Sequence, residues 1–453
     1  MHNYLIIFCF TLFYSSVFYP RNSQGLRCMI NRVSLHTFCE RLKSSDLFKD
    51  SFWALAGSAL GKGLSLLAGI AVARFLGKEV YGEYGTIRTT LFYIAIVSTF
   101  GFGYTATKFV ADYISEKPEK LKSLVWTFLK ITLVFSGLLA LVQIIFAASI
   151  ALFIDAPNLE FQLRFFSLLI ILNGLQTTQI AILSGFKKFK ETAKINIYTG
   201  FVVFIGSIIM TWFWGLTGAL GALMLSFVVQ VILNQIIIRH ALTQYNSNEK
   251  VSRSEIYSML GFSIPVALQE SLYTIVHWIG LLLLIHFANY GEVGLSSAAA
   301  LWQSVVIFVP AMLKNVMFSY LSSSDNHSSL INKLLLVNFL SSLLPVSIVI
   351  LFSGFISSFY GVSFVGLPKV LNISAAAALF ICLSEVYCYE FISRGKPWIV
   401  FIARLVRDMF ILILTYIILQ QINESQAYWF ALISLIANGI FLILLHLRYR
   451  YVK

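Results

Sequence analysis

The chain is divided by twelve long apolar stretches, and the loops between them alternate between many Lys or Arg residues and almost none. Most stretches reach the roughly 20 residues that an α-helix needs to cross a hydrocarbon layer of about 30 Å. They lack the strict polar and apolar alternation that marks the strands of a membrane barrel. We therefore predict an all-α polytopic membrane protein with helices at approximately 53–76, 86–107, 123–154, 163–184, 195–214, 217–239, 258–287, 293–319, 331–355, 370–391, 398–420 and 427–447.

The composition supports this class and excludes others. Of the 453 residues, 58% are hydrophobic and 12% are charged, too few to give a water-soluble fold its polar shell. The formal charge of +13 comes from short basic loops and not from one basic surface with interleaved aromatic residues, so no nucleic-acid partner is expected. The five cysteines show neither CxxC pairs nor metal-ligand spacing, so we expect no disulfide scaffold, metal or cofactor.

The basic loops give the chain a predicted orientation. They lie before the first predicted helix and after the second, fourth, sixth, tenth and twelfth, and the positive-inside rule places all of them in the cytoplasm. The opposite side carries few cations, which are Arg74, Lys78, Arg164 and Lys369. An even number of spans with both ends of the core in the cytoplasm follows.

Residues 1–48 form an N-terminal extension. Its first part, YLIIFCFTLFYSSVFY, is apolar but lacks the basic region and the small-residue cleavage site of a secretory signal. Three interpretations remain open, namely an additional span, a helix lying on the membrane surface, and a native start at Met29 that would remove the segment.

An internal repeat divides the core into two lobes. The segment ARFLGKEVYGEYG corresponds to LIHFANYGEVGLSS in the second half, which aligns Gly82 with Gly294, and LSGFKKFK corresponds to ISRGKPW at nearly the same displacement. We predict an N-lobe at 49–240, a cytoplasmic loop at 241–257 and a C-lobe at 258–453. Six spans per lobe make the repeat parallel, as in transporters that hold substrate between two lobes near the membrane midplane.

The first two predicted helices carry a family resemblance. Their small-residue-rich start, the G-x-x-x-Y-G turn at Gly77 to Gly82, the GFG segment at 101–103 and LSGFKKFK together resemble the Wzx-type polysaccharide (O-antigen) flippases. These flippases share the MOP superfamily with MATE exporters and lipid II flippases. The resemblance covers roughly residues 50–447.

The resemblance implies a fold and an activity. The fold is MATE-like, with two six-helix lobes around a V-shaped cavity. The activity is transfer of an undecaprenyl-diphosphate-linked oligosaccharide, an O-antigen or capsule/exopolysaccharide repeat unit, across the bacterial inner membrane by alternating access. No enzymatic step is required, and a glycan polymerase and a chain-length regulator are the expected partners.

Such a cargo needs a polar, cation-lined cavity for its diphosphate and glycan, whereas its polyprenyl tail can stay in lipid. The candidates for this cationic cavity are Lys62, Arg88, Arg404 and Arg407. Arg404 and Arg407 share one helix face with Asp408, which can neutralise one arginine and leave net positive charge. The alternatives are a structural ion pair or snorkelling to the membrane surface for Lys62, a structural salt-bridge network for the Arg404 group, and snorkelling for Arg88.

Acidic residues and helix breakers suggest how the cavity changes. Coupling or ion-pair candidates are Glu270, Glu385 and Asp408, and we predict that Glu270 faces Lys62 across the cavity and separates from it as the cavity opens. The predicted hinges, where proline or glycine permits bending, are Pro265, Pro310, Gly61 and Gly63.

Two other functions are weighed against the flippase. A MATE-like cation-coupled antiporter for small molecules usually needs acidic groups in its cavity, yet the first helix offers Lys62 and no Asp or Glu. A membrane-embedded glycan enzyme needs room for a catalytic loop, and no predicted outer loop exceeds about 20 residues.

Overall fold

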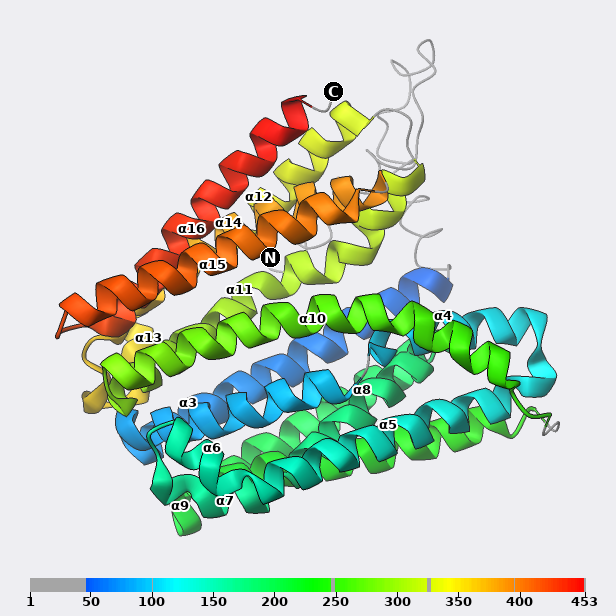
Figure 1. Ribbon diagram of the computed structural model, residues 1–453, viewed down its shortest axis with the longest axis horizontal. Helices are drawn as coiled ribbons and strands as arrows, with labels where there is room; N and C mark the ends of the chain where they lie inside the picture. The colour runs from blue at the N-terminus through cyan, green and yellow to red at the C-terminus, as the bar shows by residue number, and fades with distance from the viewer. Residues whose placement is uncertain (1–45, 100, 246–248, 324–326, 395, 452–453) are drawn as a thin grey trace, which may run out of the picture. The chain divides into compact units, whose positions relative to one another are not determined.

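The computed structural model describes residues 46–99, 101–245, 249–323, 327–394 and 396–451, with side-chain descriptions for most of them from residue 56 onward (Figure 1). The chain separates into two compact units, Met1–Trp53 and Ala54–Lys453. Most of the N-terminal extension, including the apolar segment and Met29, lies outside the described residues.

The described residues form helices and no strand. In chain order the helices are α3 (Asp46–Ser98), α4 (Phe102–Glu116), η1 (Pro118–Lys120), α5 (Leu121–Ile145), α6 (Ala147–Phe153), η2 (Pro157–Leu159), α7 (Glu160–Phe165), α8 (Leu168–Gly185), α9 (Phe189–Leu242), α10 (Arg253–Phe287), α11 (Tyr290–Ser323), α12 (His327–Leu351), α13 (Ser353–Tyr360), η3 (Val362–Phe364), α14 (Leu367–Ser393), α15 (Pro397–Gln421) and α16 (Gln426–Tyr451).

Two of these elements each contain two spans. Gly77 in α3 and Gly215 in α9 have backbone φ angles of 72° and 51°, in a region that an L-residue with a side chain rarely adopts. The chain reverses at these glycines and the next helix starts at once. Gly101, with φ 73°, interrupts the second span, which continues as α4.

Eight candidate membrane spans are long and apolar enough to cross a bilayer, and two of the eight are the double segments α3 and α9. α10 and α15 complete the twelve spans of the described chain. α15 carries Arg404, Arg407 and Asp408, which lower its overall apolarity. The prediction of an all-helical membrane protein with about twelve spans is confirmed.

The helix boundaries differ from the prediction at several places. The second span begins directly after Gly77 instead of near residue 86, because the charged segment that contains Lys78 and Glu79 is helical. The third predicted helix ends at Ile145 and is followed by the short α6. The fourth begins at Leu168, preceded by α7.

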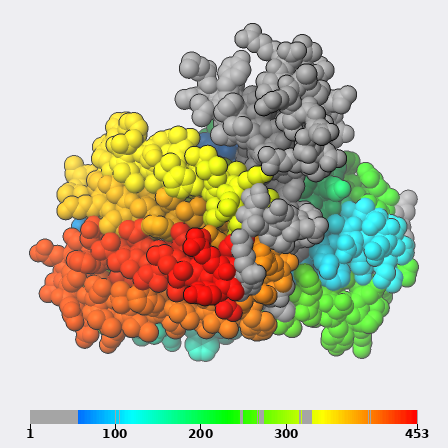
Figure 2. Space-filling view, turned by 90° about the horizontal axis from the view of Figure 1, so that it is seen from above, coloured from blue at the N-terminus to red at the C-terminus, as the bar shows by residue number. Residues whose placement is uncertain are grey.

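The helices pack as two groups, as the repeat predicts. In the N-lobe, α8 lies against α4, α5 and α9, and in the C-lobe α14 lies against α11, α12 and α16. On one face of the molecule, residues of α12 to α16 (yellow to red) gather apart from those of α4 (cyan) (Figure 2).

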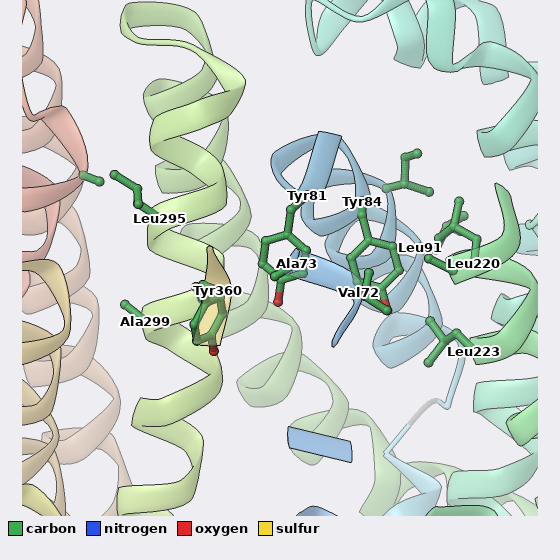
Figure 3. Packing of buried hydrophobic residues seen from close by; sticks show 14 of the residues in the cluster. Val72, Ala73, Tyr81, Tyr84, Leu91, Leu220, Leu223, Leu295, Ala299 and Tyr360 are labelled. Carbon is green, nitrogen blue, oxygen red and sulfur yellow. The ribbon is translucent and has the colours of Figure 1, made fainter. Parts of the chain in front are cut away.

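One hydrophobic core joins the lobes at the helix ends that carry Gly77, Ile154, Ala288 and Gly361, which we call the joined end. Figure 3 shows Tyr81 and Tyr84 of α3 between Tyr360 of the C-lobe and Leu220 with Leu223 of α9. The repeat-related glycines also meet here: a Cβ added to Gly82 would collide with the Tyr290 carbonyl, and one added to Gly294 with the Lys78 carbonyl. Only glycine allows this approach of α3 and α11.

α10 packs against both lobes. Near its beginning, Met259 belongs to a buried core with Phe102, Leu121 and other residues of the N-lobe. Near its end, Leu281 and Leu284 pack with Leu419 of α15. The first helix of the C-lobe repeat therefore starts in the hydrophobic core of the N-lobe.

Candidate functional site

A cavity of about 440 Å³ lies inside the C-lobe, among α10, α11, α12, α14, α15 and α16. We call it the C-lobe cavity. Its polar lining residues are His277, Ser296, Gln303, Asn338, Ser374, Glu385, Tyr389, Arg404, Arg407, Asp408, Ser434 and Asn438. A volume of this size is typical of small-molecule sites, which range over roughly 300–1,000 Å³.

Arg404 is paired with Glu385 of the neighbouring helix α14. Its Nη2 donates to Oε1 at 2.7 Å and to Oε2 at 2.9 Å, and both side chains are about three-quarters buried. Tyr389, one turn further along α14, hydrogen-bonds the same carboxylate. Charge-assisted contacts of this kind fix both groups in place.

Arg407 is paired with Asp408 on its own helix. The Nε donates to Asp408 Oδ1 at 2.8 Å, and Nη2 lies 2.7 Å from the same oxygen. Nη1 reaches Asn438 Oδ1 of α16 at 3.4 Å, and the guanidinium lies 4.8 Å from the centre of the Phe441 ring. α15 thus presents its charged face to α14 and α16.

The prediction that this face carries net positive charge is wrong, because the neighbouring helix α14 adds a negative charge. Asp408 neutralises one arginine, as the spacing indicated, but Glu385 neutralises the other. The four charged groups therefore sum to zero. The pairing across α14 and α15 depends on how two helices pack, which residue spacing within one helix does not reveal.

Lys62 and Arg88 lie apart from this group, on the two spans of α3. The Lys62 ammonium lies 5.9 Å from the centre of the Phe308 ring of α11, and the Arg88 guanidinium lies 5.4 Å from that of Phe92. Within the described residues neither cation forms an ion pair, and the buried Arg88 Nε has no hydrogen-bond partner. Neither residue lines the C-lobe cavity.

The remaining predicted residues are Glu270 and the predicted hinges, and the structure describes only some of their side chains. The side chains of Glu270 and Pro265 lie outside the described residues, so the Lys62–Glu270 pair stays a prediction. Pro310 lies within α11 and lines the C-lobe cavity. Gly61 packs against the Asn196 backbone of α9, whereas a Cβ at Gly63 would meet nothing within 4 Å.

The cavity residues that sequence reasoning missed include Asn438 and Tyr389. Asn438 is 2% exposed and interrupts an otherwise apolar part of α16. A buried amide in a membrane helix needs a polar partner, and that is the signal that would have found it. Tyr389 gave no comparable signal among the many aromatic residues.

Comparison with known proteins identifies the family through a family model and the fold through solved structures. A family model described as "Polysaccharide biosynthesis protein" matches residues 47–324. Comparison with curated protein sequences finds no significant match.

Solved structures similar to this chain are membrane transporters. An inward-facing multidrug resistance MATE transporter of the MOP superfamily has 14% identity and a TM-score of 0.73, over 88% of this chain and 98% of that one. A MOP-superfamily transporter from Pyrococcus furiosus, described as having a binding pocket of reverse polarity, has 13% identity and a TM-score of 0.65, over 90% and 97% of the two chains. At these identities the similarity establishes the fold.

Proposed function

The chain belongs to the polysaccharide biosynthesis protein family of MOP-superfamily transporters, and from this premise we propose that it flips an undecaprenyl-diphosphate-linked oligosaccharide, such as an O-antigen or capsule/exopolysaccharide repeat unit. Transport of this kind moves a polar head group past the hydrocarbon layer and needs no covalent step. The proposed location is the bacterial inner membrane, and the proposed partners are a glycan polymerase and a chain-length regulator.

The observation that carries the proposal is the lack of an ion pair at Lys62 and Arg88 among the described residues. Both lie within predicted membrane spans, and within the described residues neither has an ion-pair partner. A cation held in a membrane protein without a counter-charge is costly unless water or a ligand compensates it. A diphosphate would bring negative charge to both cations, and a guanidinium binds its oxygens as a rigid fork.

The packing of the lobes supports alternating access. Lys and Arg are concentrated at the helix ends opposite the joined end, so the positive-inside rule assigns the joined end to the outer side of the membrane. A hydrophobic core that includes both lobes there closes the outer side. In this proposal substrate enters from the cytoplasm, and the joined end separates to release it.

The test is surface glycan display in a deletion strain complemented with variants. We expect Lys62→Ala and Arg88→Ala each to lower display about tenfold, as loss of one charge-assisted contact would. Lys130→Ala is the matched control, because Lys130 is exposed on α5 and should be dispensable. Protein levels in the membrane are measured in parallel. Normal display by the Lys62→Ala/Arg88→Ala double variant would overturn the assignment of the diphosphate site.

The MATE-like antiporter remains the second candidate, because the solved structures of similar fold include multidrug transporters. It predicts that the deletion strain loses efflux of organic cations and keeps normal surface glycan. The flippase predicts the opposite pair of results, with lipid-linked oligosaccharide accumulating on the cytoplasmic face.

A further inference from the structure

The charge balance of the C-lobe cavity limits what it can bind. Arg404 is paired with Glu385 and Arg407 with Asp408, so the two cations and two anions cancel. A charged ligand would have to break one pair and leave an uncompensated charge in a partly dehydrated site, which is strongly unfavourable. An uncharged ligand avoids this penalty.

The hydrogen-bonding capacity of the cavity is nevertheless high. A guanidinium carries five N–H donors and each carboxylate oxygen accepts more than one hydrogen bond, so the ion pairs leave donors and acceptors available. Asn438 Nδ2 donates to Ser434 and its Oδ1 accepts from Arg407, which leaves the second lone pair of Oδ1 for a ligand. Ser296, Gln303 and Ser374 add further polar groups to the lining. Donors and acceptors in one small space match hydroxyl groups, because each hydroxyl both donates and accepts.

The rest of the lining is apolar and includes an aromatic ring. Phe430 of α16 and Ile411 of α15 line the cavity beside the charged groups. The electron-rich face of an aromatic ring favours contact with C–H groups that carry partial positive charge. A ligand with many hydroxyls and one C–H-rich face therefore fits this lining better than a lipid tail does.

The C-lobe cavity and Lys62 lie along different parts of the α11 surface. Lys62 contacts Phe308, whereas Ile307 and Ala311 line the cavity. A helix with its side chains is roughly 10–12 Å across. One elongated molecule with an anionic group and a neutral glycan can reach both places.

We propose that the C-lobe cavity binds an uncharged sugar residue of the transported glycan, while the diphosphate is held separately at Lys62 and Arg88. This inference rests on the proposed flippase function and adds the chemistry of a second subsite. It also reassigns Arg404 and Arg407, which the sequence had placed with the diphosphate, to recognition of hydroxyl groups.

The test measures binding of two probes to the purified full chain in lipid nanodiscs. The first probe is the free oligosaccharide that mild acid releases from the lipid-linked pool of the wild-type host, and the second is inorganic pyrophosphate. We expect Asn438→Leu to weaken binding of the free oligosaccharide about tenfold, the effect of losing a hydrogen-bonding partner. Pyrophosphate binding should be unchanged in this variant and should be lost in Lys62→Ala/Arg88→Ala.

Val406→Ala is the control, because Val406 lies on the exposed side of α15 and should alter neither affinity. If Asn438→Leu does not fold, as judged by gel filtration, Ser434→Ala changes the same wall by one oxygen and should also weaken oligosaccharide binding. No oligosaccharide binding by the wild type, or wild-type affinity in both Asn438→Leu and Ser434→Ala, would overturn the proposal. So would pyrophosphate binding that depends on Asn438.

The binding result is separate from the result for transport. Oligosaccharide binding that depends on Asn438, together with normal glycan display in the deletion strain, would retain the sugar site and reject the flippase. Lost display, together with binding that does not depend on the cavity, would retain the flippase and reject the sugar site.

Discussion

At the scale of single residues, the Arg404–Glu385 pair can be tested by removing one charge. Glu385→Gln leaves Arg404 without its counter-charge in a site where both side chains are about three-quarters buried. We expect a loss of roughly 1–3 kcal/mol in stability, seen as a lower thermal midpoint of the purified protein. Adding Arg404→Gln should restore part of the loss, since the lone charge is then gone.

The matched control for this pair is the exposed Arg164–Glu160 pair, whose side chains are 50% and 39% exposed. Glu160→Gln should change stability by less than about 1 kcal/mol, because solvent screens an exposed pair. An equal effect of Glu160→Gln and Glu385→Gln would contradict a special role for the pair in the C-lobe cavity.

Glu255, in the first turn of α10, gives a prediction about pH. The Lys117 ammonium, 2.8 Å away, and the Ser252 backbone N–H hold the pKa of this carboxyl at about 2, below its usual value of 4.5. Because the pKa is lower in the folded chain, the carboxylate stabilises the fold above about pH 4.5. That contribution is lost as the pH falls toward 2.

We therefore expect the thermal midpoint to fall less steeply between pH 5 and about pH 3 in Glu255→Gln than in the wild type. Glu249→Gln, at an exposed carboxylate 3.7 Å from Lys120, should keep the slope of the wild type. Identical slopes of the thermal midpoint against pH for all three proteins would show that the Glu255 carboxylate does not stabilise the packing of α10.

At the scale of elements, the contact of α3 with α11 depends on two glycines. Gly294→Ala would place a Cβ against the Lys78 backbone, which cannot move aside easily. We expect a loss of roughly 1–3 kcal/mol, measured as a lower thermal midpoint. Gly63→Ala, where a Cβ has open space, should instead stabilise the helix by roughly 0.5–1 kcal/mol.

The same variant tests the predicted hinge. If Gly63 provides bending, Gly63→Ala should lower glycan display although it raises the thermal midpoint. Unchanged display would remove Gly63 from the predicted hinges. Gly61→Ala does not distinguish these effects, since its Cβ would meet the Asn196 backbone.

Helix number, fold class and the shared face of Arg404, Arg407 and Asp408 could be predicted from the sequence, because they follow from hydrophobic length and helical periodicity. The start of the second span could not, because Lys78 and Glu79 resemble a loop although their backbone is helical. The pairing of Arg404 with Glu385 also could not, since it is decided by packing between helices.

At the scale of the whole molecule, the joined end must separate if the lobes alternate. Two polar contacts span it: His286 Nδ1 lies 3.3 Å from Asp155 Oδ2, and the Tyr290 hydroxyl donates to the Ile154 carbonyl at 2.9 Å. The double variant Asp155→Cys/His286→Cys is made in a background without native cysteines, and its two new thiols are cross-linked with a short bifunctional reagent. This cross-link should abolish glycan display. Each single cysteine variant should keep display after the same treatment, and normal display by the linked protein would contradict separation at this end.

The double attachment of α10 has a kinetic consequence. Since one part of this helix is embedded in the N-lobe core and another in the C-lobe, every change in the angle between the lobes must deform it. The bending stiffness of α10 then contributes to the barrier between the two states, independently of substrate affinity. Gly261→Ala adds a Cβ in open space on α10 and should make this helix stiffer. We expect it to slow turnover at saturating substrate and to leave the substrate concentration at half-maximal rate unchanged.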